Sequence, residues 1–329
     1  MFTSSQFIKK REKPVLTKED IPYKAGLIFN AGVAKFNGKY VMIFRNDVPD
    51  VWGERVFSPG STNLGFATSD DGINWTSAKA PCLTLDDYRD KFGINDRVTK
   101  FYDPRLTVID GIVYMCFAID TAHGVCGGVA TTEDFEHFDI KYVSVPENRN
   151  MVIFPGKIGG NFVRLERPMP VYSRGRDRFD TWMSFSPDLK YWGNTKFVFG
   201  VEDVPFANDK VGPGAPPILT EKGWLTTFHA VWRDETRGKH GWEPKWTKIY
   251  TAGIMLLDKD EPWKILGMSK EPLIAPELPY EKDEGFRTDV IFPGGMLLDG
   301  DEVKIYYGAA DTVEAVCTAD VNDLISLCI

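Results

Sequence analysis

The sequence has no long hydrophobic run, little cysteine and no excess of positive charge. None of the apolar stretches in its 329 residues approaches the roughly 18 residues that a membrane-spanning helix requires. Lys and Arg number 39 against 47 Asp and Glu, and the formal net charge is −8. Nucleic acid or an anionic membrane would need a basic field, so we expect neither as a partner. A few local cations could still hold a small anion.

Cysteine is scarce, and its pattern favours free thiols and argues against a structural zinc site. The five cysteines are odd in number and form no CxxC pair, which is typical of reduced thiols in a cytosolic protein. The basic N-terminal segment from Lys9 to Lys13 is not followed by an apolar run, so we expect no signal peptide and a cytoplasmic location.

Helical periodicity is weak, and only residues 85–92 and 321–327 could each form a short helix. One pattern instead recurs five times: a short strand, a Gly-containing turn and an apolar or aromatic strand, at residues 33–44, 106–117, 156–165, 217–228 and 295–307. A Ser/Thr-x-Asp turn follows in residues 65–75, 128–135 and 182–192, with an aromatic residue to pack between units. These repeats predict an all-β fold, a single five-bladed β-propeller over residues 1–329 with short terminal extensions. An all-β sandwich or two small β domains are the alternatives.

In a propeller the inner strands line a central channel, so polar residues that interrupt them are candidate functional groups. Each alone could be a solvated or salt-bridged surface group, but their comparable places in the repeat favour a shared site. The candidates are Asn30, Arg45, Asp103, Arg149, Arg167, Lys210, His229 and Asp311.

Asp103 lies before an inner strand, and the proline after it favours an extended backbone. It is either a proton donor or the ion-pair partner of Arg105.

Two Arg, one Lys and one His converging on a channel would form a phosphate site, because guanidinium groups bind oxyanions in a bidentate manner. The loop at residues 211–215 lacks the Gly-Lys-Ser/Thr of a Walker A motif, so nucleotide binding is unsupported.

Over residues 29–320 the sequence resembles glycoside hydrolase family 130, the inverting mannoside phosphorylases. The resemblance rests on these motifs together and in this order: Phe29-Asn30, Phe44-Arg45, Ser69-Asp70-Asp71-Gly72-Ile73-Asn74-Trp75, Tyr102-Asp103-Pro104-Arg105, Asn148-Arg149-Asn150, Phe154-Pro155 and Tyr306-Tyr307-Gly308-Ala309-Ala310-Asp311-Thr312. Residues 233–246 look longer than in many members, and Thr288-Asp289 stands where Pro-Asn is expected.

The resemblance implies a five-bladed fold and a role for each candidate. Asp103 matches the general acid, whose proton is relayed through a mannose hydroxyl. Basic and phosphate-side positions match Arg149, Arg167, Lys210, His229 and Tyr250. Positions that hold the mannosyl ring match Asn30, Arg45 and Asp311.

The activity implied is inverting phosphorolysis of β-1,4-linked mannosides, which releases α-D-mannose 1-phosphate. An inverting hydrolase needs an acid and a separate base, whereas phosphate is already an anionic nucleophile. Inorganic phosphate is then a co-substrate, and no cofactor or metal is expected. The motif at residues 102–105 resembles the branch that acts on mannooligosaccharides, while mannosyl-glucose and mannosyl-N-acetylglucosamine stay open. Aromatic-rich loops favour a homo-oligomer.

Three other functions remain. An inverting β-mannosidase on the same fold would lack the basic cluster. A three-carboxylate glycosidase would use Asp103, Glu166 and Asp289. A carbohydrate-binding propeller would use tryptophans as stacking platforms, with Trp52, Trp75, Trp232 and Trp242 as candidates. No role is expected for His123, His137 or His240.

Overall fold

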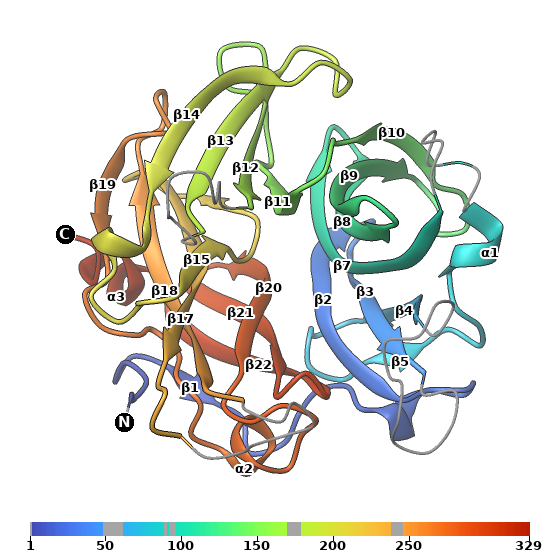
Figure 1. The fold of residues 1–329 in the computed structure, drawn as a ribbon, viewed down its shortest axis with the longest axis horizontal. Coiled ribbons are helices and arrows are strands. Elements are labelled where there is room, and N and C mark those ends of the chain that lie inside the picture. The colour runs from blue at the N-terminus through green and yellow to red at the C-terminus, as the bar shows by residue number, and fades with distance from the viewer. Residues whose placement is uncertain (1, 49–61, 89–90, 92–96, 170–178, 238–245) are drawn as a thin grey trace.

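The computed structural model describes residues 2–48, 62–88, 91, 97–169, 179–237 and 246–329. In this part of the chain the strands form five antiparallel sheets, arranged around a common centre (Figure 1). The predicted five-bladed β-propeller is therefore confirmed. We number the sheets as blades 1 to 5 in the order in which their first strands occur along the chain.

Each blade is a meander whose first strand lies nearest the centre. Blade 1 contains β2 (Leu27–Phe36), β3 (Lys39–Asp47), β4 (Thr62–Ser69), β5 (Thr76–Ser77) and β6 (Leu83–Thr84). Blade 2 contains β7 (Val98–Ile109), β8 (Ile112–Thr121), β9 (Gly124–Thr132) and β10 (Asp139–Val143). Blade 3 contains β11 (Asn148–Ile153), β12 (Phe162–Pro168), β13 (Thr181–Ser186) and β14 (Gly193–Phe199).

The last two blades complete the circle, and the N-terminal strand joins the final one. Blade 4 contains β15 (Lys210–Pro213), β16 (Ile218–Leu219), β17 (Trp224–Arg233), β18 (Lys248–Leu257) and β19 (Ile265–Met268). Blade 5 contains β20 (Ile291–Asp299), β21 (Glu302–Ala309), β22 (Val313–Asp320) and, from the other end of the chain, β1 (Lys9–Lys10). Both termini lie on the same side of the molecule in Figure 1.

The helices are short. They are α1 (Leu85–Tyr88), α2 (Pro279–Lys282) and α3 (Val321–Ser326), with 3-10 turns η1 (Lys18–Asp20) and η4 (Val201–Asp203). The first and last occur where the sequence predicted short helices. None of the helices in the described ranges combines the length and the apolar character that crossing a membrane requires.

The predicted turns explain the register of the inner hairpins. Asn37 and Gly38 both have positive φ, 50° and 77°, and so do Asp110 and Gly111, 51° and 77°. Two consecutive residues with positive φ are what a two-residue type I′ hairpin requires, and Asn-Gly and Asp-Gly adopt this conformation readily. The short turns fix β3 against β2 and β8 against β7.

The Ser/Thr-x-Asp turns end the third strands as predicted. In blade 1 the Ser69 hydroxyl accepts from the Gly72 N–H at 2.9 Å, and Asp71 accepts from the next two N–H groups at 2.8 Å. Thr132 with Asp134 and Ser186 with Asp188 repeat this pattern in blades 2 and 3. The aromatic ring carried by the second turn, Phe135, stacks on Phe66 of blade 1 at 4.5 Å.

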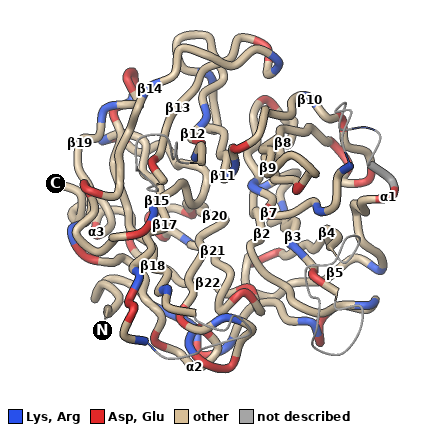
Figure 2. The backbone as a smooth tube through the Cα atoms, in the orientation of Figure 1, with Lys and Arg blue, Asp and Glu red and all other residues tan. Residues whose placement is uncertain are grey.

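The hydrophobic core lies between the blades. Its five clusters of buried side chains, as far as the described residues show, each join two neighbouring blades, and one of them also closes blade 5 onto blade 1. Charged side chains of both signs are spread over the whole chain rather than gathered on one side (Figure 2). Because the apolar side chains pack between the blades, the propeller centre can hold polar groups.

Candidate active site

β-bulges at matching places in three inner strands put polar side chains at the centre. The pairing register shifts at Asn30 in β2, at Asp103 in β7 and at Asn150 in β11. These residues have φ of 53°, 53° and 59°, the left-handed region that Asn and Asp tolerate better than most residues. A bulge re-aims a side chain out of the sheet, and here it turns each toward the axis.

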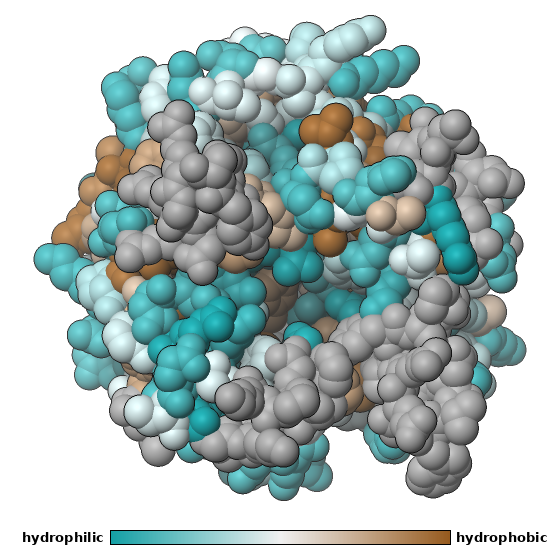
Figure 3. Space-filling model, viewed as in Figure 1, coloured by the Kyte–Doolittle hydropathy of each residue, from teal (hydrophilic) through white to brown (hydrophobic). Residues whose placement is uncertain are grey.

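The bulges border a pocket of about 270 Å³ at the propeller centre. The face of the molecule is hollowed there, and hydrophilic side chains line much of the hollow (Figure 3). The described lining includes six cationic side chains, Arg45, Lys100, Arg149, Arg167, Lys210 and Arg287, and three carboxylates, Asp103, Asp120 and Asp311. It also includes Phe29, Asn30, Tyr102, Asn150, Trp246, Tyr250, Val290 and Phe292.

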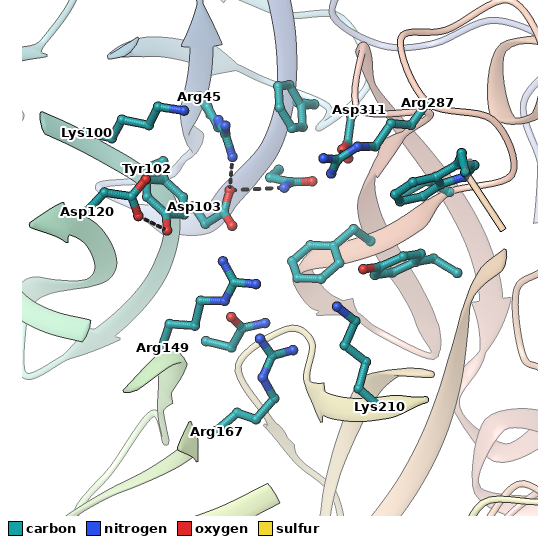
Figure 4. A pocket seen from close by; sticks show the side chains of 17 residues that line it. Arg45, Lys100, Tyr102, Asp103, Asp120, Arg149, Arg167, Lys210, Arg287 and Asp311 are labelled. Carbon is teal, nitrogen blue, oxygen red and sulfur yellow. Dashed lines mark hydrogen bonds and ion pairs between the residues drawn. The ribbon is translucent and has the colours of Figure 1, made fainter. Parts of the chain in front are cut away.

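Asp103 is held by blade 1. Its Oδ1 accepts hydrogen bonds from Asn30 Nδ2 at 3.0 Å and from Arg45 Nη1 at 3.1 Å (Figure 4). Arg45 is oriented in turn by Asp47, to which its Nε and Nη2 donate at 2.9 and 2.6 Å. The predicted group of Asn30, Arg45 and Asp103 is thus one connected network.

The surrounding cations decide the charge of Asp103. Burial raises the pKa of Asp103, whereas the nearby guanidiniums and the Asn30 amide lower it, Arg45 most strongly. The cations outweigh burial, and the pKa lies below its ordinary value. The carboxyl is therefore ionised at neutral pH in the pocket as it stands.

Arg105 is not the ion-pair partner of Asp103. Its guanidinium donates instead to backbone carbonyls of the inner strands, at distances of 2.7 to 3.4 Å, and acts on Asp103 only through its charge. The acceptors are the carbonyl oxygens of Asn30, Pro104, Gly214 and Pro293. The pairing of Asp103 with Arg105 that the sequence left open is therefore wrong, and the ion-pair partner of Asp103 is Arg45 at 3.1 Å.

Opposite Asp103 lies a group that we name the cationic corner: Arg149, Arg167 and Lys210. Figure 4 shows both arginines pointing into the pocket with Lys210 beside them. The Nε of Arg149 and the Nε and Nη2 of Arg167 are buried without a hydrogen-bond partner. Guanidinium N–H groups that are buried and unpartnered leave a site for an oxyanion.

Burial and mutual repulsion depress the pKa values of two groups in the cationic corner, Lys210 and Arg167. Burial, with Arg167 and Arg149 nearby, lowers the pKa of Lys210 to about 7. Burial and the charge of Arg149 lower the pKa of Arg167 to about 9. An anion bound here would relieve this repulsion and restore the charged forms.

His229 lies behind this corner rather than in the described pocket lining. It is fully buried on β17, with its Nε2 2.9 Å from Arg167 Nη1 and its Nδ1 3.1 Å from the Pro213 carbonyl oxygen. Burial and the charge of Arg167 hold the pKa of His229 well below its ordinary value, so the ring is neutral. The sequence had grouped it with the cations.

The remaining predicted residues border the other side of the pocket. Asp311 forms an ion pair with Arg287 at 2.9 Å, and Arg287 lies 4.7 Å above the Trp246 ring. Tyr250 stacks on Trp246, with ring centroids 5.9 Å apart and planes within 6°. Asp311 and Tyr250 therefore line the same pocket as Asp103, from opposite ends of a continuous wall.

Sequence reasoning missed three charged residues of the lining. Lys100 and Asp120 face each other in β7 and β8, and the Asp120 carboxylate accepts from the Tyr102 hydroxyl at 2.6 Å. Arg287 lies on the connection between α2 and β20. Lys100 could have been predicted from the sequence, since it lies three residues before Asp103 on the same inner strand. Arg287 carries no repeat signal.

The other carboxylates and aromatics nominated from the sequence lie elsewhere. Glu166 is buried in an ion pair with Arg164 at 2.8 Å, and Asp289 pairs with Arg237 on the rim of another cavity. Trp75 packs edge-on against Tyr306 between blades 1 and 5. Trp52, Trp242, His240 and all but the ends of the 233–246 stretch lie outside the described residues. Among those described, no three His, Cys, Asp or Glu side chains gather as metal ligands would.

Comparison with known proteins links this site to mannoside phosphorylases. A family model described as β-1,4-mannooligosaccharide phosphorylase matches residues 7–329. A 1,2-β-oligomannan phosphorylase from Thermoanaerobacter sp. (strain X514) is 31% identical over 320 residues, 95% of this chain and 97% of the relative. A β-1,4-mannooligosaccharide phosphorylase from Ruminococcus albus is 31% identical over 322 residues, 95% and 88% of the two chains.

A solved structure supports the same relationship. The β-1,2-mannobiose phosphorylase of Listeria innocua, in complex with β-1,2-mannobiose, superposes with a TM-score of 0.82 and 25% identity. The match covers 97% of this chain and 98% of that one.

Proposed function

Because the chain belongs to glycoside hydrolase family 130, the mannoside phosphorylases, we propose that it cleaves β-mannosides by inverting phosphorolysis and releases α-D-mannose 1-phosphate. The observation that carries the proposal is the cationic corner opposite Asp103. It offers buried, unpartnered guanidinium N–H groups and an ammonium in a protein whose net charge is negative. Inorganic phosphate has the charge and the oxygen geometry that these donors require.

In this mechanism phosphate, held by Arg149, Arg167 and Lys210 with Tyr250 beside them, attacks the anomeric carbon. The glycosidic C–O bond breaks, and the departing oxygen takes the proton that Asp103 supplies through a mannose hydroxyl. Asn30, Arg45 and Asp311 hold the mannosyl ring between the two. Holding both reactants in one pocket makes the attack effectively intramolecular.

Bound phosphate would also favour protonation of the general acid, Asp103. Asp103 is ionised while the guanidiniums around it are unneutralised, and a general acid must carry a proton. A phosphate anion next to Arg149 offsets part of that positive charge, so the pKa of Asp103 rises when the co-substrate binds. Phosphate thus serves as nucleophile and as the group that allows Asp103 to be protonated.

For the substrate we propose β-1,4-linked mannooligosaccharides first. The motif at residues 102–105 and the similarity to the Ruminococcus albus enzyme support this linkage. β-1,2-linked oligomannosides are the second candidate, because the Thermoanaerobacter relative that carries that name is equally similar, at 31% identity. Mannosyl-glucose and mannosyl-N-acetylglucosamine are further acceptor variants of the same reaction.

An inverting β-mannosidase is less well supported by the pocket. Such an enzyme needs a second carboxylate to activate water on the face of the sugar opposite the acid, roughly 6.5–9.5 Å from it. On that side the described lining has Arg149, Arg167 and Lys210. The other two carboxylates of the lining are engaged by Tyr102 and Arg287.

The test is incubation with β-1,4-mannobiose and, separately, β-1,2-mannobiose, each with and without phosphate. We expect α-mannose 1-phosphate, identified by its anomeric proton signal, only when phosphate is present. The faster disaccharide assigns the linkage. Equal mannose release without phosphate would establish hydrolysis and overturn the proposal.

We further propose that the reaction needs no cofactor and takes place in the cytoplasm, where a sugar phosphate product is retained by its charge. A homo-oligomer stays a prediction. Size-exclusion chromatography with light scattering tests it.

A further inference from the structure

His229 makes two hydrogen bonds that together determine its protonation. Its Nε2 lies 2.9 Å from Arg167 Nη1, and its Nδ1 lies 3.1 Å from the carbonyl oxygen of Pro213. A guanidinium has only donors, so Nε2 must be the acceptor and carry no proton. A carbonyl oxygen has only acceptor capacity, so Nδ1 must carry the proton. Both bonds can exist only in the neutral ring with its proton on Nδ1.

We propose that His229 is a neutral positioning residue that orients Arg167 for phosphate, and not a cation that binds phosphate itself. This inference rests on the proposed function and deepens it. Arg167 lines the pocket, and with its Nη1 bound to His229 its Nε and Nη2 are left buried without a partner. The imidazole thus decides which N–H groups of Arg167 face the bound anion.

The surroundings of His229 fit a neutral acceptor. Phe292 packs on its ring with centroids 4.7 Å apart, and Tyr250 stacks at 6.5 Å with planes within 20°. The ring is fully buried and has Arg167 as its neighbour, so a second positive charge on it would be unscreened and repelled. Its environment offers no carboxylate in hydrogen-bond contact among the described residues.

Gly212 makes room for the pair. It lies opposite His229 in the register of β15 and β17. A Cβ at this position would collide with the Cε1 of His229 and lie 2.9 Å from the Cδ of Arg167. Three strands of two blades therefore cooperate to hold one guanidinium, and a methyl group at residue 212 would displace both partners without removing either.

Two substitutions test the contact between His229 and Arg167. His229→Gln is long enough to offer its carbonyl oxygen to Arg167, whereas His229→Asn reaches only toward Pro213. We expect the dissociation constant for phosphate, measured by calorimetry, to rise roughly tenfold to a hundredfold in His229→Asn, the effect of losing a hydrogen bond to a charged group. His229→Gln should recover most of that loss, and the KM for mannoside should change little in either. Gly212→Ala should resemble His229→Asn.

A spectroscopic test reads the wild-type ring directly and requires no turnover. Long-range ¹H–¹⁵N spectra of the wild-type protein, which has only four histidines, report the tautomer of each ring, and the His229→Gln spectrum assigns the signal. We expect His229 to keep a proton on Nδ1 alone from pH 6 to 8, with and without phosphate. An imidazolium or an Nε2–H tautomer would overturn the proposal, as would equal loss of phosphate affinity in Gln and Asn.

These outcomes are distinct from failure of the proposed function. If the chain were not a phosphorylase, the wild-type protein would bind no phosphate in the calorimeter, while the tautomer of His229 would still be readable. Phosphate binding with an imidazolium at residue 229 would leave the proposed function standing and refute the positioning role.

Discussion

At the scale of single residues, the site depends on opposing electrostatic effects on a few buried groups. Asp103 accepts from Asn30 and Arg45, and its ionised form is stabilised by positive charge on both sides. The charged form of Lys210 is destabilised by burial and by the positive charges of Arg167 and Arg149 beside it. One ligand, an oxyanion, would shift both groups toward their protonated forms.

The first prediction concerns Asp103→Asn. The amide oxygen can still accept from Asn30, and Arg45 keeps its two hydrogen bonds to Asp47, so the fold should be retained. Turnover of mannobiose should fall by a factor of about 10² to 10⁴, the usual contribution of a general acid. Phosphorolysis rates at saturating phosphate and thermal melting measured by circular dichroism provide the check.

A substrate with an acidic leaving group serves as the internal control. An aryl β-mannoside departs with little help from a proton, so its phosphorolysis should lose much less rate than that of mannobiose in Asp103→Asn. If both substrates lost rate equally, Asp103 would be a binding residue and not the proton donor.

Lys210 gives a pH-dependent prediction. Burial and the neighbouring guanidiniums lower its pKa to about 7, and the charged form is the one that binds phosphate. Below pH 7 Lys210 is already charged, so it stabilises bound phosphate in full. Above pH 7 it must first take up a proton, and this requirement weakens phosphate binding. Lys210→Arg keeps the charge at every pH. The ratio of phosphate dissociation constants, wild type over Lys210→Arg, should rise about tenfold per pH unit well above pH 7.

Because the ionisation of phosphate affects both dissociation constants equally, its effect cancels in this ratio. Calorimetry from pH 6 to 9 measures it. A ratio independent of pH would mean that Lys210 stays charged throughout and that the cationic corner does not depress its pKa. Lys210→Ala should weaken phosphate binding at all pH values and leave the KM for mannoside little changed.

At the scale of elements, a strand of two residues attaches the N-terminal segment to blade 5. β1 pairs with β22, joining Lys10 to Cys317 in register. The Lys10 ammonium reaches the carboxylate of Glu281 at 2.7 Å, and that carboxylate also accepts from the Tyr307 hydroxyl at 2.7 Å. Glu281 is completely buried, and its carboxylate also accepts from the backbone N–H groups of Glu277 and Leu278.

Removing that cation should therefore destabilise the attachment of the N-terminal strand. We expect Lys10→Ala to lower the free energy of unfolding in urea by about 3–5 kcal/mol, the effect of leaving a buried charge without its partner. Lys9 is the matched control on the same strand, because its side chain is exposed and Lys9→Ala should change stability by less than about 0.5 kcal/mol. Equal effects of the two substitutions would contradict a specific role for the ion pair.

The same elements show what could be predicted from the sequence. Asn37-Gly38 and Asp110-Gly111 encode their turns locally, and so do the capped Ser/Thr-x-Asp turns, so the hairpins and the number of blades were readable. β1 was not, because a two-residue Lys-Lys strand has no pattern of its own and pairs with a strand about 300 residues away.

The site was readable to a similar extent. Residues at bulges of inner strands, such as Asn30 and Asp103, carry the signal of Asn or Asp interrupting an apolar strand. The depth of His229 behind Arg167 could not be predicted, since it depends on packing between blades 3 and 4. Arg287 was missed because it reaches the pocket from a connection without a repeat.

At the scale of the whole molecule, hydrophobic clusters hold neighbouring blades together in pairs, but they do not connect all the blades at the axis. Arg105 supplies much of the connection between the blades at the axis. From β7 its guanidinium donates to Pro104 at 2.7 Å in its own blade and to Asn30 at 3.4 Å in blade 1. It also donates to Gly214 at 3.0 Å in blade 4 and to Pro293 at 3.2 Å in blade 5. One side chain thus links four of the five described blades.

Arg105→Met should therefore loosen the propeller as a unit. The thioether side chain fills similar space but donates no hydrogen bond. A buried carbonyl that loses its donor costs about 1–3 kcal/mol, and four of them lose it here, so we expect the free energy of unfolding to fall by about 4 kcal/mol or more. Because two of the carbonyls belong to Asn30 and to the residue after Asp103, kcat should fall with stability. Hydrogen exchange should accelerate in the inner strands of blades 1, 2, 4 and 5 together, whereas faster exchange in blade 2 alone would show that Arg105 serves only its own blade.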